Sequence, residues 1–276
     1  MTGPDPADIK TCCVQAYERD AVALLLGDSY HPGGARLTRR LADRLALRPG
    51  QRVLDIACGP GATAVLLAAE YGVEVEGIDL AAPILARAEA AVEAAGLTGR
   101  VRFQHADSEA TPFAAGVFDA VVCECALCLF PDKPRAASEF ARVLRPGGRL
   151  GITDVTVADS GLPAELTDLA AHIACIADAR PVTGYLDLLA AAGLRVTTVD
   201  HHDTAITTMI DHIQARLNLL RITAPEALTA ANLTPTAAVP YVRAARRAVT
   251  DGRLGYALIV AEKPSSPHSG RAVESA

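Results

Sequence analysis

Apolar residues in the N-terminal part of the chain recur at the spacing of one face of a helix. Leu37, Leu41 and Leu45 follow one another four residues apart, which predicts an amphipathic helix. A similar pattern at residues 9–17 predicts an earlier helix, and the segment GDSYHPGG at 27–34 predicts a turn between them. Residues 1–48 are therefore expected to form a helical cap.

After residue 48 the pattern changes to short apolar runs that alternate with longer amphipathic segments. The runs predict buried strands and the segments predict helices. Strands that alternate with helices form a parallel sheet covered on both faces, because each connection crosses over in the right-handed sense. The predicted strands of this part lie at 52–57, 73–79, 101–106, 118–124 and 149–155, and the helices at 63–71, at 83–96 and after the capping residue Asp132.

The last part of the chain adds two strands, at 195–202 and 255–263, and several helices. The helices are predicted at about 163–178, at 185–193 and, two or three of them, within 205–250. The expected fold class is therefore α/β, a doubly wound, Rossmann-like sheet of seven strands with the last one antiparallel. Its expected parts after the cap are a core at 49–204, a helical insertion at 205–253, the last core strand at 254–263 and a disordered tail at 264–276.

Composition excludes several classes of function. Aromatic residues make up 4% of the 276 residues and tryptophan is absent, so the base-stacking surfaces of RNA-binding proteins are not expected. A net charge of -6 without a basic cluster argues against any nucleic acid partner. No apolar run has the length of a membrane span or a signal peptide. The seven cysteines are then expected to be reduced thiols of a cytoplasmic protein.

The segment VLDIACGPGATA places Gly59 and Gly61 between a predicted strand and a predicted helix. Glycine lets a ligand approach the backbone closely, and the start of a helix offers free N–H groups. Asp79 lies twenty residues after Gly59, at the end of the second predicted strand, where a carboxylate can bind ribose hydroxyls. The pattern also matches the G-x-G-x-x-A fingerprint of dinucleotide-binding proteins, so an NAD-dependent dehydrogenase is an alternative at this point.

Residues at the ends of other strands separate these alternatives. Asp55 lies inside the first strand, Asp107 follows the third, and the segments TPFAAGVFDAVV and ARVLRPGGRL lead into the fourth and fifth. Together with the glycine segment, this series over roughly 50–156 resembles the class I S-adenosylmethionine-dependent methyltransferases. The resemblance implies the methyltransferase form of the sheet and S-adenosyl-L-methionine as the cofactor. It implies a cofactor site made of Asp55, Ala57, Gly59, Gly61, Asp79, Leu80, Asp107, Ser108 and Cys123.

The same resemblance assigns parts of the cofactor to these residues. Asp55, Gly59 and Gly61 are expected at its methionine end. Asp79 is expected to hold the ribose hydroxyls, and Asp107 and Ser108 to lie beside the adenine. Many family members have glycine where this chain has Ala57, which is a small change.

Three cysteines fall within six residues in the segment CECALC at 123–128, directly after the fourth strand. Core packing, a metal site, a disulfide and a site for a sulfur-seeking ligand each account for such a cluster. A disulfide conflicts with a reducing compartment, and C-x-C-x-x-C supplies only three of the four ligands that structural zinc sites use. Core packing is favoured for Cys123 and Cys128.

The surroundings of Cys125 also resemble the arsenite methyltransferases. The segment DKPRAASEFARVLRPGGRLGITDV follows it, and Cys175 in ACIADARPVTGYLDLLAAAGL matches a second cysteine of that family. The resemblance implies that Cys125 and Cys175, with Cys13 as a candidate third ligand, bind trivalent arsenic as the methyl acceptor. Thiolate is the ligand that soft arsenic prefers, and the arsenic lone pair needs no base. Arsenite or methylarsenite is therefore the expected substrate.

Two other functions remain open. The first is methylation of a small organic molecule at oxygen, nitrogen or carbon, which would require a roomier pocket and a base. His31 and His172 are the candidate bases, and the N-terminal cap and the helical insertion should cover the acceptor. The second is a thiol-based metalloid sensor, which would neither bind the cofactor nor turn over.

Overall fold

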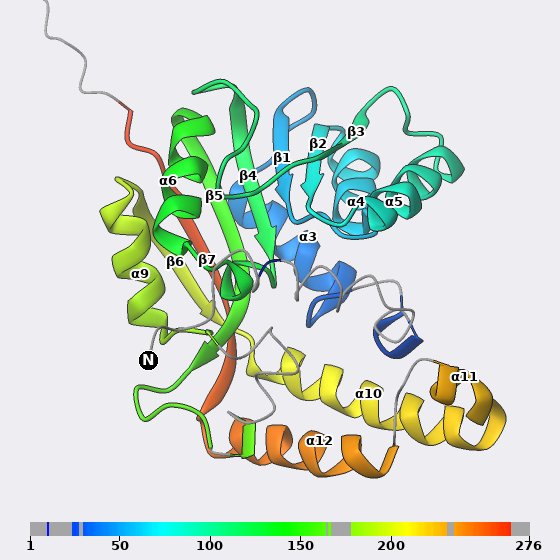
Figure 1. Ribbon diagram of the computed structural model, residues 1–276. Helices are drawn as coiled ribbons and strands as arrows, with labels where there is room; N and C mark the ends of the chain where they lie inside the picture. Colours follow the sequence, from blue (N-terminus) through cyan, green and yellow to red (C-terminus); the bar gives the residue numbers. More distant parts are fainter. Residues whose placement is uncertain are drawn as a thin grey trace, which may run out of the picture.

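The computed structural model describes residues 10, 24–27, 30–163, 165–166, 178–230 and 235–265. At its centre lies a seven-stranded sheet in the order β3-β2-β1-β4-β5-β7-β6 (Figure 1). β7 runs antiparallel to both of its neighbours, and the other neighbouring strands are parallel. The predicted α/β class and the antiparallel last strand are thereby confirmed. The strands are β1 (Arg52–Ile56), β2 (Glu74–Asp79), β3 (Val101–His105), β4 (Phe118–Glu124), β5 (Leu144–Val157), β6 (Arg195–His201) and β7 (Leu254–Glu262).

Helices cover both faces of the sheet, and each face has its own hydrophobic cluster. Alternate residues of each strand point to opposite faces, so both sets of side chains are buried. On one face lie α3 (Gly34–Leu45), α4 (Ala62–Tyr71), α10 (Asp203–Thr223) and α12 (Pro235–Thr250), and on the other α6 (Lys133–Val143) and α9 (Val182–Ala191). α5 (Ala82–Ala94) packs beside β3 and α4 at the edge of the sheet.

Most element boundaries fall within two residues of the predicted ones, and the clear exceptions are the starts of β5 and of α9, which begins at Val182. β3 ends at His105, so Asp107 lies two residues beyond the strand. β5 begins at Leu144 and already contains the segment RPGG, because a shift of register between Phe118 and Ala120 of β4 accommodates it. The predicted helices near 9–17 and 163–178 fall mostly outside the described residues, as do Cys13, His172, Cys175 and the tail from 266.

A glycine lets α3 lie directly on the sheet. A Cβ atom at Gly151 of β5 would come within 2.7 Å of Leu41 and 3.0 Å of Leu45, both from α3. Only a residue without a side chain permits this approach. The contact brings the N-terminal half of α3 to the end of β4, where the Thr38 hydroxyl lies 3.0 Å from the Glu124 carboxylate.

The segment predicted as two or three helices forms α10, α11 (Pro225–Ala230) and α12. α10 packs against α12 and β7, and Figure 1 shows this helical layer beyond the carboxyl ends of the parallel strands. Within the described ranges of the chain, no helix combines the length and the apolar character needed to cross a bilayer.

Candidate active site

A hollow opens at the carboxyl ends of β1, β2 and β4, beside the turn that joins β1 to α4. Its volume is about 1060 Å³ including the open mouth and the solvent space in front of it. Open α/β sheets bind their ligands at this edge. Of the residues expected at a cofactor site, those that line the hollow are Asp55, Ala57, Gly59, Asp79, Leu80, Asp107 and Ser108.

Asp79 at the end of β2 holds two neighbouring loops in place. Its Oδ2 atom accepts a hydrogen bond from the Gly59 N–H at 2.9 Å, and its Oδ1 atom accepts one from the Ala81 N–H at 2.9 Å. Burial raises the pKa of this carboxyl, although the N–H groups of Ala81 and Gly59 act in the opposite direction. The carboxylate therefore joins the glycine turn to the end of β2 at the wall of the hollow.

Gly61 was expected to line the site, and its position is different. It precedes α4 with a φ of 82°, in the left-handed region that favours glycine. A Cβ atom there would lie 3.0 Å from both Ala88 of α5 and Phe103 of β3. Gly61 thus lets α4 begin close to these two elements, and it shapes the turn without facing the hollow.

Asp55 of β1 is a buried acid that lines the hollow. Its Oδ2 atom has no hydrogen-bond partner among the described residues. Burial raises the pKa of Asp55 well above its usual value, and the nearby carboxylates of Glu124 and Asp79 add to this increase. A buried, unsatisfied carboxyl group is costly unless a ligand donates to it or carries a positive charge.

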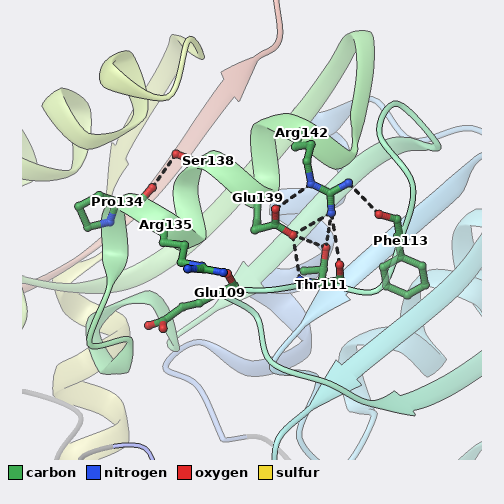
Figure 2. A network of polar contacts seen from close by, with 8 residues as sticks. All are labelled: Glu109, Thr111, Phe113, Pro134, Arg135, Ser138, Glu139 and Arg142. Atoms are coloured by element: carbon green, nitrogen blue, oxygen red, sulfur yellow. Dashed lines mark hydrogen bonds and ion pairs between the residues drawn. The ribbon is translucent and has the colours of Figure 1, made fainter. Parts of the chain in front are cut away.

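The loop after β3 is tied to α6 by a network of polar contacts (Figure 2). Oε2 of Glu139 accepts hydrogen bonds from the N–H and the hydroxyl of Thr111, each at 2.8 Å, and Arg142 donates to the Phe113 carbonyl at 2.8 Å. Arg135 donates to the Glu109 carbonyl at 2.7 Å. These contacts set the position of the segment that begins at Asp107.

Lys10 reaches the same loop from the N-terminal part of the chain. Its Nζ atom lies 2.6 Å from Asp107 Oδ2 and 2.5 Å from Glu109 Oε2. Both acids flank Ser108, which is buried and lines the hollow. The sequence carries no signal for this contact, because Lys10 and Asp107 lie in different predicted elements, 97 residues apart.

A second polar cluster lies at the end of β4. The Glu124 side chain is 4% exposed, and its Oε2 atom accepts hydrogen bonds from the hydroxyls of Thr63 at 2.6 Å and Thr38 at 3.0 Å. His31 lies beside it, with Nε2 at 3.5 Å from the same oxygen. Sequence reasoning proposed His31 as a candidate base and did not pair it with Glu124.

The four described cysteines form no disulfide, and their surroundings differ. Cys123, expected at the cofactor site, is fully buried and packs with the cluster that faces α6 and α9, because the strand period turns it away from Glu124. Cys58 at the wall of the hollow has a raised pKa owing to burial. Cys125 is partly exposed, lines the hollow and has a φ of 55°. Its expected partner, Cys175, lies outside the described residues.

Cys128 belongs to a separate buried polar group under the loop after β4. Its N–H donates to Asp154 Oδ2 at 2.9 Å, and its carbonyl accepts from Lys133 Nζ at 3.0 Å. Lys133 also donates to Asp178 and, at 3.0 Å, to the Phe130 carbonyl. Burial raises the pKa of Asp154 to about 6. This group of buried polar residues holds the loop that carries Leu129 and Phe130 to the hollow.

Metal binding was one of the functions considered for the clustered cysteines. Within the described ranges, no set of three or more His, Cys, Asp or Glu side chains could hold a metal ion.

The sheet order and the position of the hollow are those of the class I methyltransferases. Comparison with known proteins agrees with this class. Residues 53–148 match the family model described as a methyltransferase domain. Methyltransferase GfsG of Streptomyces halstedii is 32% identical over 251 residues, which cover 86% of this chain and 83% of GfsG.

Two further similarities extend this result. The 27-O-demethylrifamycin SV methyltransferase of Amycolatopsis mediterranei is 35% identical over 181 residues, 60% of this chain and 65% of that enzyme. The solved structure of geranyl diphosphate C-methyltransferase from Streptomyces coelicolor A3(2) aligns with a TM-score of 0.76 at 19% identity, over 94% of this chain and 100% of that one. The latter likeness concerns the fold alone. This chain belongs to the class I S-adenosylmethionine-dependent methyltransferases.

Proposed function

We propose that this methyltransferase transfers a methyl group from S-adenosylmethionine to a hydroxyl or amine of a small organic molecule. The observation that carries the assignment of the pocket is the buried Asp55 carboxyl, which lines the hollow and whose Oδ2 atom has no hydrogen-bond partner among the described residues. The cofactor brings a sulfonium and an ammonium group, and such charges satisfy a buried carboxylate. Asp55 therefore lies at the methionine end.

The other wall residues fit the remaining parts of the cofactor. Asp79 presents a carboxylate to the ribose hydroxyls, while its bonds to Gly59 and Ala81 keep it in place. Asp107 and Ser108 lie beside the adenine, and Leu80 adds an apolar contact. The network on α6 fixes their loop. When bound, the cofactor supplies an electrophilic methyl group, and these residues orient it and hold it out of water.

The acceptor side favours an organic molecule over arsenic. Two close thiols would be required to grip trivalent arsenic. Cys58 and Cys125 line the hollow, Cys123 and Cys128 are both 0% exposed, and Cys175 lies outside the described residues, so the thiols alone do not decide the acceptor. An imidazole and a carboxylate line the wall near the end of β4, and a hydroxyl or amine acceptor uses such groups whereas an arsenic lone pair does not. The rifamycin relative, named for methylating a demethylated oxygen, supports the same choice.

The proposal is tested by supplying methyl-labelled S-adenosylmethionine with different acceptors. The panel contains 27-O-demethylrifamycin SV, simple phenols, primary amines and arsenite with glutathione, and mass spectrometry identifies the labelled products. We expect label on an oxygen or nitrogen atom. The proposal would be wrong if the label appeared on arsenic alone and was lost in Cys125→Ser but retained in Cys58→Ser. That result would show that the acceptor is a metalloid.

A further inference from the structure

Glu109, in the loop after β3, is a buried acid that contacts three separate parts of the chain, and its side chain is 7% exposed. Its Oε2 atom lies 2.5 Å from Lys10 Nζ, and its Oε1 atom accepts a hydrogen bond from the Asp132 N–H at 2.7 Å. Its own N–H donates to Asp107 Oδ1 at 2.9 Å. One residue therefore connects the N-terminal part of the chain, the loop after β3 and the start of α6.

These contacts place Glu109 behind two walls of the hollow. Asp107 and Ser108, which directly precede it, line the hollow, and so do residues 129–131, which directly precede Asp132. Glu109 itself is not among the lining residues. Its two carboxylate oxygens and its N–H thus hold both wall segments from outside the space that a ligand would occupy.

The charges around Asp107 depend on the same residue. Lys10 Nζ lies 2.6 Å from Asp107 Oδ2, so one ammonium group lies between two carboxylates. Hydrogen bonds and charges of Asp107 and Glu109 raise the pKa of Lys10, although burial opposes them. Without this ammonium the two carboxylates would repel each other, and Glu109 would be a buried charge without a counter-ion.

The Asp107 side chain keeps access to a ligand while it is held in this way. It is 34% exposed and lines the hollow. One of its oxygens accepts from the Glu109 N–H and the other pairs with Lys10, so its orientation is set from both sides. A carboxylate oxygen can accept more than one hydrogen bond, and an amino group of a ligand can therefore still donate to Asp107.

We propose that Glu109, together with Lys10, is a positioning residue for the adenine end of the cofactor. This inference rests on the proposed function, which puts the adenine beside Asp107 and Ser108. Glu109 acts through Asp107 and through the wall at 129–131, without touching the reacting atoms. Walls that are already ordered lose less freedom when the ligand binds, so the effect should fall on affinity and not on the chemical step.

The first test is calorimetric titration with S-adenosylhomocysteine and with 5′-methylthioadenosine, which lacks the amino-acid end. Glu109→Ala should raise the dissociation constants of both ligands by roughly 10-fold, since it removes contacts that involve a charged group. Glu109→Gln, which keeps an oxygen for the Asp132 N–H, should raise them less. Glu70→Gln changes an exposed carboxylate on α4 and is the matched control. A variant that only folds less well would bind fewer equivalents of ligand with an unchanged dissociation constant.

The second test is a double-mutant cycle that examines the charges. Lys10→Met leaves Asp107 and Glu109 without their shared cation, whereas in a Glu109→Gln background it leaves one carboxylate. Lys10→Met should therefore raise the dissociation constant of 5′-methylthioadenosine more in the wild-type background than in Glu109→Gln. Lys10→Arg keeps the charge and should retain part of the affinity that Lys10→Met loses.

The third test separates binding from chemistry with the acceptor that gives label in the panel described above. Glu109→Ala should raise KM for S-adenosylmethionine and leave kcat nearly unchanged, because the methyl group lies at the other end of the cofactor. A loss of kcat with an unchanged KM would overturn the inference.

The binding experiments can overturn it as well. One such outcome is an unchanged affinity in Glu109→Ala. Another is a loss for S-adenosylhomocysteine that is absent for 5′-methylthioadenosine, because the contacts would then serve the methionine end. Strictly additive effects in the cycle would remove the role of the shared cation.

Failure of the proposed function has different signatures. If no organic acceptor is labelled, the acceptor assignment is lost, while the binding results for Glu109 and Lys10 still stand. If Asp107→Ala leaves the affinity for 5′-methylthioadenosine unchanged, the placement of the adenine is wrong and the inference falls with it. If Asp107→Ala weakens binding and Glu109→Ala does not, the inference alone is wrong.

Discussion

Asp79 accepts a hydrogen bond from the backbone N–H of Gly59 at 2.9 Å, so the end of β2 holds the turn that follows β1. The two residues are twenty positions apart, and the parallel pairing of β1 with β2 brings them together. The wall of the hollow is therefore built from backbone of one strand end and a side chain of the next. A change at Asp79 should therefore alter both the position of the glycine turn and the affinity for a ligand in the hollow.

Asp79→Asn is expected to weaken cofactor binding. The amide retains one acceptor and loses the charge that favours ribose hydroxyls and the two N–H donors. Hydrogen bonds to charged groups contribute about 1.5–3 kcal/mol, so the dissociation constant for S-adenosylhomocysteine should rise roughly 10- to 100-fold. Isothermal titration measures it. Glu76→Gln on the same strand is the control, and an equal loss in both variants would contradict the assignment.

The affinity for S-adenosylmethionine should rise with pH through Asp55. The pKa of this carboxyl is raised by burial and by its acidic neighbours, so a fraction of it is protonated at pH values where an exposed aspartate is fully ionised. A cationic ligand binds the ionised form, and binding should therefore release protons. Titration calorimetry in buffers of different ionisation enthalpy measures this release. Asp55→Asn should abolish it, and unchanged proton release in that variant would show that another group is responsible.

Gly61→Ala is expected to lower the free energy of unfolding by more than backbone strain at this φ angle alone would lower it. A side chain at a φ of 82° is strained, and the added methyl would also crowd Ala88 and Phe103. Left-handed strain costs about 1–2 kcal/mol and overpacking about 1–3 kcal/mol more. Gly96→Ala is the matched control, because its φ is 68° and a Cβ atom would meet nothing within 4 Å. Denaturant unfolding should give the larger loss for Gly61→Ala, and equal losses would exclude the crowding.

Glu139→Gln should lower the free energy of unfolding at neutral pH, and this difference from the wild type should disappear in acid. Hydrogen bonds from Arg142, together with those from Thr111, lower the pKa of Glu139 to about 2 from 4.5, although burial opposes them. A lowered pKa in the folded state adds stability above pH 4.5 that is lost as the pH falls toward 2. Because the pair is partly solvated, we expect about 1–2 kcal/mol.

Unfolding free energies of wild type and Glu139→Gln should therefore converge as the pH is lowered from 5 to about 2. Glu70→Gln serves as the comparison, since Glu70 pairs with Arg39 on an exposed surface and its pair is screened by salt. A difference between wild type and Glu139→Gln that stays constant with pH would mean that the network stabilises the loop by packing, not by charge.

The alternation of apolar runs and amphipathic segments determined the architecture of this protein, because strand and helix formation depend on neighbouring residues. The glycine turn and Asp79 were found in the same way, since each is adjacent to a strand end. Strand periodicity also explains the error at Cys123: counting from Glu124 would have placed its side chain on the opposite face.

Only the tertiary structure decided which side chains meet at the end of β4, on the proposed acceptor side. Glu124 meets Thr38 from 86 residues away and Thr63 from 61 residues away, and their contact depends on how α3 lies on β5 at Gly151. Lys10 and Asp107 are 97 residues apart. A linear pattern records which residues are apolar within one element, whereas the distance between two side chains of different elements depends on the packing of everything between them.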